Sequence, residues 1–214
     1  MADLKQLYEA ILTGDAKIAV AITRRAIDEK INPGILINDV MIPAMNEVGK
    51  LYEEQEYFVP ELLLAGRAMK GALELIRPLL AEAGTQPTGR VVIGTVQGDL
   101  HDIGKNLVIS MLEGAGFEVT DLGVDVPPEK FIDAVRTKSP DILCLSALLT
   151  VTMPAMKTTI DALANAGVRH SVKILVGGAP VTREFAKQIG ADGYGETARV
   201  AVTVAREICA RPAA

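Results

Sequence analysis

Residues 90–108, RVVIGTVQGDLHDIGKNLV, decide the fold of this chain. An apolar run rich in β-branched residues, RVVIGTV, passes through a short polar loop into a segment whose apolar residues have helical spacing. A strand that leads directly into a helix is the repeating unit of a parallel, doubly wound sheet. Ligands bind beyond the carboxyl ends of the strands in such sheets, so the polar loop is a candidate site.

The rest of the second half repeats this alternation. Three more apolar runs, FEVTDLGV, DILCLSAL and VKILVGG, follow, and a short fifth strand is expected near Ala191–Tyr194. We therefore predict an α/β fold with a flavodoxin-like (Rossmann-type), doubly wound sheet of five parallel strands. Helices are expected near 102–115, 128–138, 153–167, 181–189 and 196–209.

Residues 1 to about 83 have the apolar spacing of helices throughout. Asn32-Pro33 marks a helix start, Pro43 predicts a kink within the following helix, and Pro60 starts another helix. Four or five such helices make a small bundle. The stretch 82–90, EAGTQPTGR, has the composition of a linker. The predicted domains are therefore a helical domain over 1–86 and an α/β domain over 87–214.

The composition excludes several classes of function. There are 27 acidic and 22 basic residues with no basic cluster, which argues against a nucleic-acid partner. No apolar stretch reaches 18 residues, so no membrane association is expected, and the N-terminus lacks the apolar core of a signal peptide. Cys144 and Cys209 belong to no paired motif, which fits a cytoplasmic protein.

The loop after the first strand contains one of the only two histidines. Asp99 precedes His101 by two residues, and Gly104 follows it by three. A histidine at the mouth of a sheet can bind a metal, and a nearby aspartate can fix its tautomer and raise its basicity. The same residues also fit a plain strand-to-helix turn, in which Asp99 or Asp102 caps the helix and His101 is exposed.

Two further strands end at the same edge of the predicted sheet. The third strand runs into the hydroxyl-rich stretch Ser146–Thr152, and the fourth ends in Gly177-Gly178. Paired glycines allow a bulky group to approach the backbone closely. Each segment alone fits an ordinary strand end or turn, whereas together they indicate one deep site.

These residues, taken in order, resemble the cobalamin-binding signature. The pattern is Asp-x-His-x-x-Gly, 41 residues, Ser-x-Leu, 28 residues and Gly-Gly. The N-terminal helices are similar to the helical cap of methionine synthase and of the corrinoid proteins that serve methanol, methylamine or aromatic methyl-ether methyltransferases. The resemblance implies a bound cobalamin or related corrinoid, base-off and histidine-on, with His101 as the lower axial ligand of cobalt.

The resemblance also implies a role for each motif. Asp99 would hydrogen-bond the imidazole of His101, and Thr152 would continue this relay. Phe58, in EEQEYFVPELLLAGRAM, is a candidate apolar lid in the cap and equally fits a core aromatic. The other implied cofactor contacts lie in the first loop (Gly98, Leu100, Asp102, Ile103, Gly104) and in a pocket for the displaced nucleotide tail (Ser146, Leu148, Thr150, Gly177, Gly178, Gly195).

The implied function is that of a methyl carrier. Such a protein shuttles a methyl group on cobalt between a substrate-specific methyltransferase and a second methyltransferase, whose acceptor is a thiol coenzyme or tetrahydrofolate. A reductive activase is a further implied partner. The chain would be a subunit of a methyltransferase system rather than a stand-alone enzyme, because no separate module is large enough to activate donor and acceptor.

Three other functions share parts of this pattern. The B12-binding subunit of a radical mutase has the sheet motifs but lacks a helical cap. A B12-responsive regulator needs a basic recognition helix, and Arg24-Arg25 offers too little charge. A phosphoacceptor receiver domain has the same topology but needs an aspartate at the end of the third strand, where this chain has Leu145-Ser146-Ala147.

Overall fold

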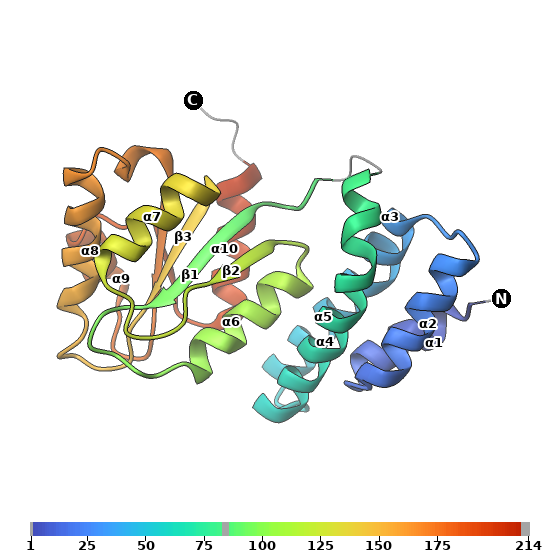
Figure 1. The fold of residues 1–214 in the computed structure, drawn as a ribbon. Coiled ribbons are helices and arrows are strands. Elements are labelled where there is room, and N and C mark those ends of the chain that lie inside the picture. Colours follow the sequence, from blue (N-terminus) through green and yellow to red (C-terminus); the bar gives the residue numbers. More distant parts are fainter. Residues whose placement is uncertain (1, 83–85, 211–214) are drawn as a thin grey trace. The chain divides into compact units, whose positions relative to one another are not determined.

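The computed structural model describes residues 2–82 and 86–210 and divides the chain into two compact units (Figure 1). The first unit contains the chain up to Pro87 together with Ser110–Gly116. The second contains Thr88–Ile109 and the chain from Phe117 onward. Part of the predicted linker, residues 83–85, lies outside the described residues.

The first unit is built from helices, several of which start at a side-chain cap. Asp3, Asp15 and Asn32 each accept a hydrogen bond from a backbone N–H in the first turn of the helix that follows. Such caps satisfy N–H groups that have no partner inside the helix. The elements are α1 (Leu4–Leu12), α2 (Ala16–Asp28), α3 (Pro33–Ile35), the π-helical turn η1 (Leu36–Met41), α4 (Ile42–Glu53) and α5 (Val59–Glu82).

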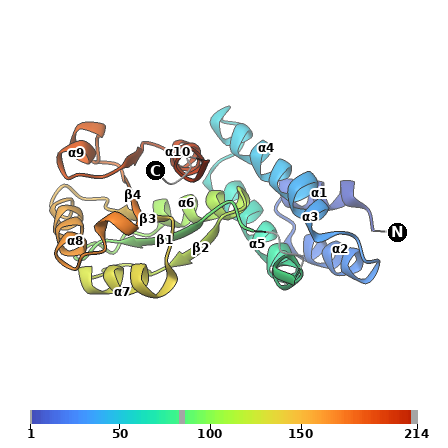
Figure 2. The ribbon, with the colours of Figure 1, turned by 90° about the horizontal axis from the view of Figure 1, so that it is seen from above.

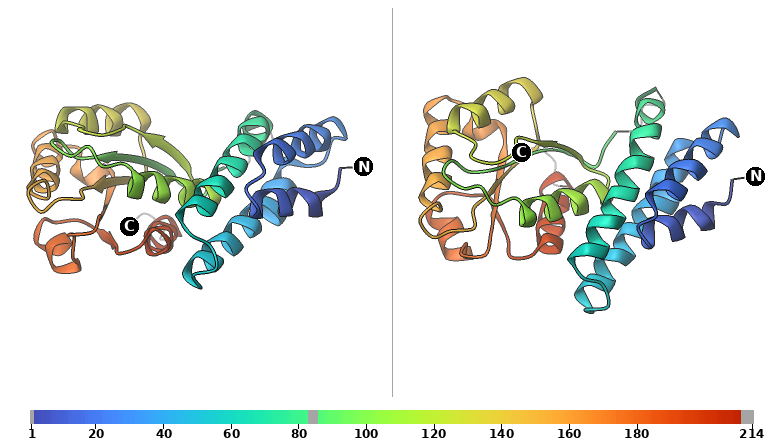
Figure 3. Two further views of the ribbon diagram at one scale, coloured as in Figure 1. Left: turned by 90° about the horizontal axis from the view of Figure 1, so that it is seen from below. Right: turned by 60° about the horizontal axis from the view of Figure 1, so that its bottom comes forward.

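The core of this unit comes from apolar stripes on neighbouring helices. Helix α2 packs along α5 and against α1, as Figure 3 shows. Gly14, at the end of α1, has φ +77, and a Cβ there would lie 2.5 Å from the Leu64 Cβ, so only glycine fits this turn. The buried apolar side chains include Leu7, Ile11, Ala19, Ala26, Leu62, Ala65, Met69 and Ile76.

The helix around Pro43 is irregular one turn earlier than predicted. The kink was expected at Pro43, whereas the structure has the π-helical turn Leu36–Met41 immediately before α4. Proline lacks an N–H, and its ring clashes with the carbonyl four residues earlier, here Asp39. The wider π-turn accommodates that conflict before the proline is reached.

The second unit contains the predicted sheet of five parallel strands. Their order is β2-β1-β3-β4-β5, which is the flavodoxin-like order, and the fold class is therefore confirmed. The strands are β1 (Arg90–Thr95), β2 (Glu118–Asp121), β3 (Ile142–Ser146), β4 (Lys173–Gly177) and β5 (Gly193–Gly195).

Helices cover both faces of this sheet, as Figure 2 shows, with α7 and α8 on one face and α6 and α10 on the other. On one face, strand residues such as Val92, Leu143 and Val176 pack with Phe131 of α7 and Met156 of α8 in one buried cluster. Burial on both faces explains why β1, β3 and β4 are continuous apolar runs. The helices are α6 (Ile103–Gly114), α7 (Pro128–Lys138), α8 (Pro154–Asn165), η2 (Arg169–Ser171), α9 (Arg183–Gln188) and α10 (Ala198–Ala210).

The strand register brings the site segments to one level of the sheet. Thr95 pairs with Ser146, Ser146 with Gly177, and Gly177 with Gly195. Four strands thus end side by side, and the loops that follow them share one edge.

None of the helices in the described ranges has the length and hydrophobicity that a membrane crossing requires.

Candidate functional site

Asp99 is the centre of the site and is fully buried. Its Oδ1 accepts hydrogen bonds from the His101 backbone N–H at 3.0 Å and from His101 Nδ1 at 2.7 Å. Its Oδ2 accepts from the Leu148 backbone N–H at 2.8 Å and from the Thr152 hydroxyl at 2.6 Å. One carboxylate therefore ties the loop after β1 to the loop after β3.

These donors keep Asp99 ionised. Burial alone favours the neutral carboxyl group, but hydrogen bonds from Thr152, the His101 and Leu148 N–H groups and the imidazole outweigh it. The pKa of Asp99 is consequently held well below its usual range. The Thr152 hydroxyl also lies 2.9 Å from the Leu149 carbonyl, but the closer, charged oxygen of Asp99 is the better acceptor for its proton.

His101 is oriented by this carboxylate. An ionised carboxylate only accepts hydrogen bonds, so the imidazole must donate from Nδ1, and the lone pair of Nε2 is available for a metal. The Thr95 hydroxyl fixes the backbone by donating to the His101 carbonyl at 2.9 Å. The His101 side chain is 48% exposed, so a ligand can reach Nε2 from solvent.

Exposed apolar side chains lie near His101 in the site segments. Leu100 and Ile103, which flank the histidine in sequence, are 71% and 69% exposed. Leu148, in the loop tied to Asp99, is also exposed. A Cβ added at Gly104 would meet nothing within 4 Å, which leaves open space at the start of α6. Exposed apolar side chains around one oriented imidazole suit a large, flat, apolar ligand.

The segments of the predicted tail pocket meet at the same edge. Ser146 is half-buried beside Gly177, and Thr150 is exposed in the turn before α8. The glycines there have a second use that the sequence analysis did not foresee. A Cβ at Gly178 would lie 1.8 Å from the Ala147 carbonyl oxygen, and one at Gly177 would lie 3.0 Å from that of Gly195.

The remaining predicted residues fall into two groups. In the first loop, Gly98 takes φ +84, and Asp102 accepts a hydrogen bond from Asn106. Phe58 belongs to the helical unit, where it is exposed and its N–H donates to Glu61.

Two further partners of Asp99 were not predicted from the sequence. The Leu148 N–H is a backbone group, and no side-chain pattern reveals it. Asp125 donates its N–H to the Asp99 carbonyl at 2.9 Å and accepts from the Gly98 N–H at 2.7 Å. Its signal in sequence is faint: an aspartate in a turn, a residue type that tolerates the left-handed conformation.

Comparisons with known proteins find relatives that cover both units. A family model described as a B12 binding domain matches residues 89–203, and a second model with the same description matches residues 3–77. The dimethylamine corrinoid protein 1 of Methanosarcina acetivorans is 39% identical over 97% of both chains.

Two solved structures are similar over nearly the whole chain. One is a methanol:cobalamin methyltransferase complex from Methanosarcina barkeri, with a TM-score of 0.86, 34% identity and coverage of 97% of this chain and 79% of that one. The other is a cobalamin-binding protein from Desulfitobacterium hafniense, with a TM-score of 0.75, 31% identity and coverage of 97% and 99%. The chain therefore belongs to the family of B12-binding corrinoid proteins.

Proposed function

We propose that this protein binds a corrinoid base-off and histidine-on and carries a methyl group between two methyltransferases. The observation that carries the proposal is the buried Asp99 carboxylate, which joins Thr152 to His101 and leaves Nε2 free. The relatives support it, because one is named a dimethylamine corrinoid protein and another belongs to a methanol:cobalamin methyltransferase complex.

The residues present fit a corrinoid. His101 would supply the lower axial nitrogen, and Asp99 would orient that imidazole and raise its basicity as a ligand. Leu100 and Ile103 would contact the apolar rim of the ring, and the open space beside Gly104 would admit its edge. When bound, the corrinoid supplies a cobalt centre that accepts a methyl group and gives it up again.

The tail pocket is the second part of the proposal. With His101 as axial ligand, the cofactor's own base and its nucleotide tail must lie elsewhere. Ser146, Leu148 and Thr150 supply hydroxyl and apolar groups at the edge where four strands end. Gly177, Gly178 and Gly195 let the segments there pack closely, because a Cβ at these positions would meet the Gly195 carbonyl, the Ala147 carbonyl or Ala201. We place the tail at the edge that these closely packed segments form.

The first unit is proposed as a cap over the methyl-carrying face of the corrin. Phe58 is exposed there, and an exposed aromatic side chain is a suitable lid. The chain would then need to open for each partner: a substrate-specific methyltransferase, a second methyltransferase and a reductive activase. Cys144 and Cys209 are free thiols, which supports a location in the reducing cytoplasm.

Electron paramagnetic resonance tests the ligation. The protein is loaded with cobalamin, reduced to Co(II), and prepared with either 14N- or 15N-labelled histidine. We expect the nitrogen hyperfine splitting to change on labelling and to be lost in His101→Ala. His170→Gln is the matched control, because His170 is exposed in η2, and its signal should equal the parent's. A splitting that ignores the label would mean that the nucleotide base is still the ligand.

A further inference from the structure

The turn after β2 is bonded to the loop that carries Asp99 and His101. Beyond the strand itself, Thr95 N–H donates to the Gly123 carbonyl, and Val126 N–H donates to the Thr95 carbonyl, both at 3.0 Å. Val96 and Val126 also form a parallel bridge. These bonds prolong the pairing of β1 and β2 up to the point where the loop begins.

Asp125 holds this loop at two consecutive residues. Its Oδ1 accepts the Gly98 N–H at 2.7 Å, and its own N–H donates to the Asp99 carbonyl at 2.9 Å. The two bonds fix the Gln97–Gly98 peptide unit, through its N–H, and the Asp99–Leu100 peptide unit, through its carbonyl, so they hold the Gly98–Asp99 segment at both ends. The position of the Asp99 backbone is therefore set from the β2 side of the loop.

We propose that Asp125 is a positioning residue for the axial imidazole, an inference that rests on the proposed function. The hydrogen bonds of Asp125 go to Gly98 and Asp99 and not to His101. It acts on the backbone of Asp99, and the carboxylate of Asp99 then sets the tautomer and direction of the imidazole.

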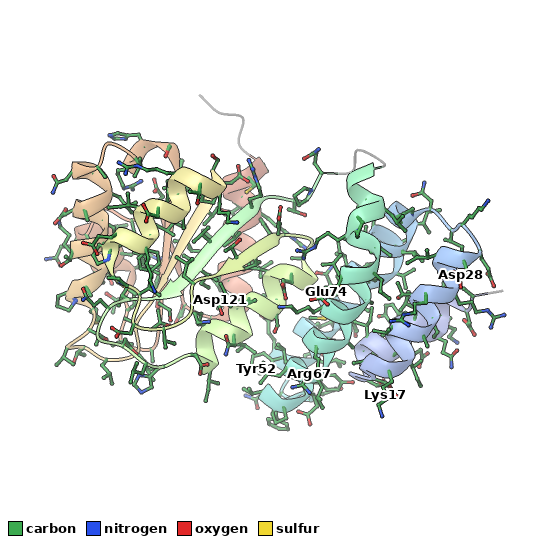
Figure 4. All side chains as sticks on the ribbon, viewed as in Figure 1. Lys17, Asp28, Tyr52, Arg67, Glu74 and Asp121 are labelled. Carbon is green, nitrogen blue, oxygen red and sulfur yellow. The ribbon has the colours of Figure 1, made fainter. Side chains whose placement is uncertain are left out.

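The turn that carries Asp125 is itself anchored. Asp121, labelled in Figure 4, accepts from the Gly123 N–H at 2.9 Å through one oxygen and pairs with Lys105 at 2.7 Å through the other. The Lys105 side chain is only 2% exposed, and its ammonium also donates to Asn106. Because Lys105 lies in the first turn of α6, the ion pair fixes the turn relative to the helix that follows His101.

Loss of Asp125 should loosen the His101 bond first. The Thr152 hydroxyl and the Leu148 N–H would still hold Oδ2 of Asp99 in its buried position. The bond from Nδ1 to Oδ1 ends on a half-exposed side chain, where water competes for the same atoms. A small rotation of the Asp99 peptide would thus weaken mainly the hydrogen bond between Oδ1 and the imidazole.

The backbone of Asp125 allows its two contributions to be separated. Asp125 has φ +51 and faces Gly98, which has φ +84. Asn tolerates the left-handed region and keeps a side-chain acceptor, Gly tolerates it without a side chain, and Ala does neither. Asp125 is exposed, so all three variants should fold.

The test uses the imidazole nitrogens in the protein without cofactor. The chain has only two histidines, and His170→Gln assigns the signals of His101. At about pH 8, where a histidine of ordinary pKa is neutral, long-range 1H–15N spectra report which nitrogen carries the proton. We expect Nδ1–H in the parent and in Asp125→Asn. In Asp125→Gly and Asp125→Ala the ratio of Nδ1–H to Nε2–H should fall roughly tenfold, the lower end of outer-shell effects.

Asp141→Ala is the matched control. Asp141 also accepts a backbone N–H, that of Arg90, at 2.7 Å, but at the opposite end of β1. Its loss should leave the tautomer ratio unchanged. Parent-like ratios in Asp125→Gly and Asp125→Ala would overturn the proposal, and so would an equal shift in Asp141→Ala, which would mean general loosening.

The loaded protein gives a second readout. In the Co(II) spectrum the histidine-nitrogen signal should weaken in Asp125→Ala and be restored in Asp125→Asn. The two proposals can fail separately. A parent with the Nδ1–H tautomer but no histidine nitrogen on cobalt would sink the proposed function and leave the positioning by Asp125 intact.

Discussion

The loops after β1 and β4 lie at the same edge of one sheet and are held in opposite ways. The first, around Asp99, is fixed by side chains that donate to one buried carboxylate. The second, at Gly177-Gly178, depends on the absence of side chains, because its backbone lies against the carbonyls of Ala147 and Gly195. Substitution should therefore damage the fold most at the glycines and the chemistry most at the first loop.

The largest effect is expected for Gly178→Ala. Its Cβ would lie 1.8 Å from a carbonyl oxygen, and φ +134 is a conformation that side chains rarely adopt. We expect the free energy of unfolding to fall by about 3 kcal/mol or more, measured in urea. Gly167→Ala is the control, since φ is +75 there but a Cβ meets nothing within 4 Å, and it should cost only about 1 kcal/mol. Equal losses of unfolding free energy in the two variants would show that the backbone conformation, and not the contact with Ala147, causes the destabilisation.

Asp99→Ala should come next. It leaves the Leu148 N–H without its acceptor and the Thr152 hydroxyl with only the Leu149 carbonyl, at a cost of about 2 kcal/mol. Asp99→Asn keeps one acceptor oxygen and should cost less, while weakening the axial ligand by roughly 10–100-fold. Urea unfolding and the Co(II) spectrum measure the two effects. An Asp99→Ala variant as stable as the parent would mean that water replaces the carboxylate and that the carboxylate is not needed to hold the loop.

The same residue gives a pH dependence with a definite sign. The pKa of Asp99 is lower in the folded than in the unfolded chain, where aspartate titrates near about 3.9. Ionised Asp99 therefore stabilises the fold above that pH, and this contribution is lost as the pH falls below it. The stability difference between the parent and Asp99→Asn should shrink from neutral pH towards about pH 3. A stability difference that stays constant over this pH range would contradict a lowered pKa of Asp99 in the folded chain.

The sequence predicted the central strands β1, β3 and β4 well because they are buried on both faces and are therefore apolar runs. The first and fourth strands were placed within one residue of their ends. The π-helical turn Leu36–Met41 was not predicted. Pro43 indicates that the helix is irregular, but not which irregular structure the backbone adopts. The short strand β5 was predicted near its true place, although Gly193–Gly195 has weak strand propensity.

The part of the site that consists of hydrogen bonds between side chains could be predicted from the sequence. Asp99, His101 and Thr152 were expected to form one relay, and the distances of 2.7 and 2.6 Å place them in contact. The Leu148 N–H and Asp125 were missed because both act through backbone groups, and those contacts exist only once β1, β2 and β3 lie side by side. The steric role of Gly178 was hidden for the same reason.

His101→Ala should affect the fold less than either change above. It removes one half-exposed hydrogen bond to Asp99, whose Oδ1 keeps the residue 101 N–H, so we expect a loss of about 1 kcal/mol. The corrinoid should still bind, because most of its contact area lies on other residues, while the axial nitrogen signal disappears. Gel filtration with absorbance at corrinoid wavelengths measures retention. Complete loss of corrinoid from a folded His101→Ala protein would contradict this separation of fold and chemistry.

The smallest change, Gly104→Ala, should alter fold and chemistry in opposite directions. Gly104 lies in the first turn of α6, where a Cβ would meet nothing within 4 Å. Alanine favours a helix over glycine, so the protein without cofactor should gain about 0.5 kcal/mol of stability. If the edge of the corrin occupies that open space, the added methyl group must push it away from Nε2 of His101, and corrinoid binding should weaken several-fold. The gain in stability serves as an internal control, because it shows that the loop is intact when binding falls. Unchanged binding in a more stable variant would mean that the space beside Gly104 faces solvent in the loaded protein as well. The contrast between the two loops would then be smaller, since Gly104 would be required neither for the fold nor for ligand binding.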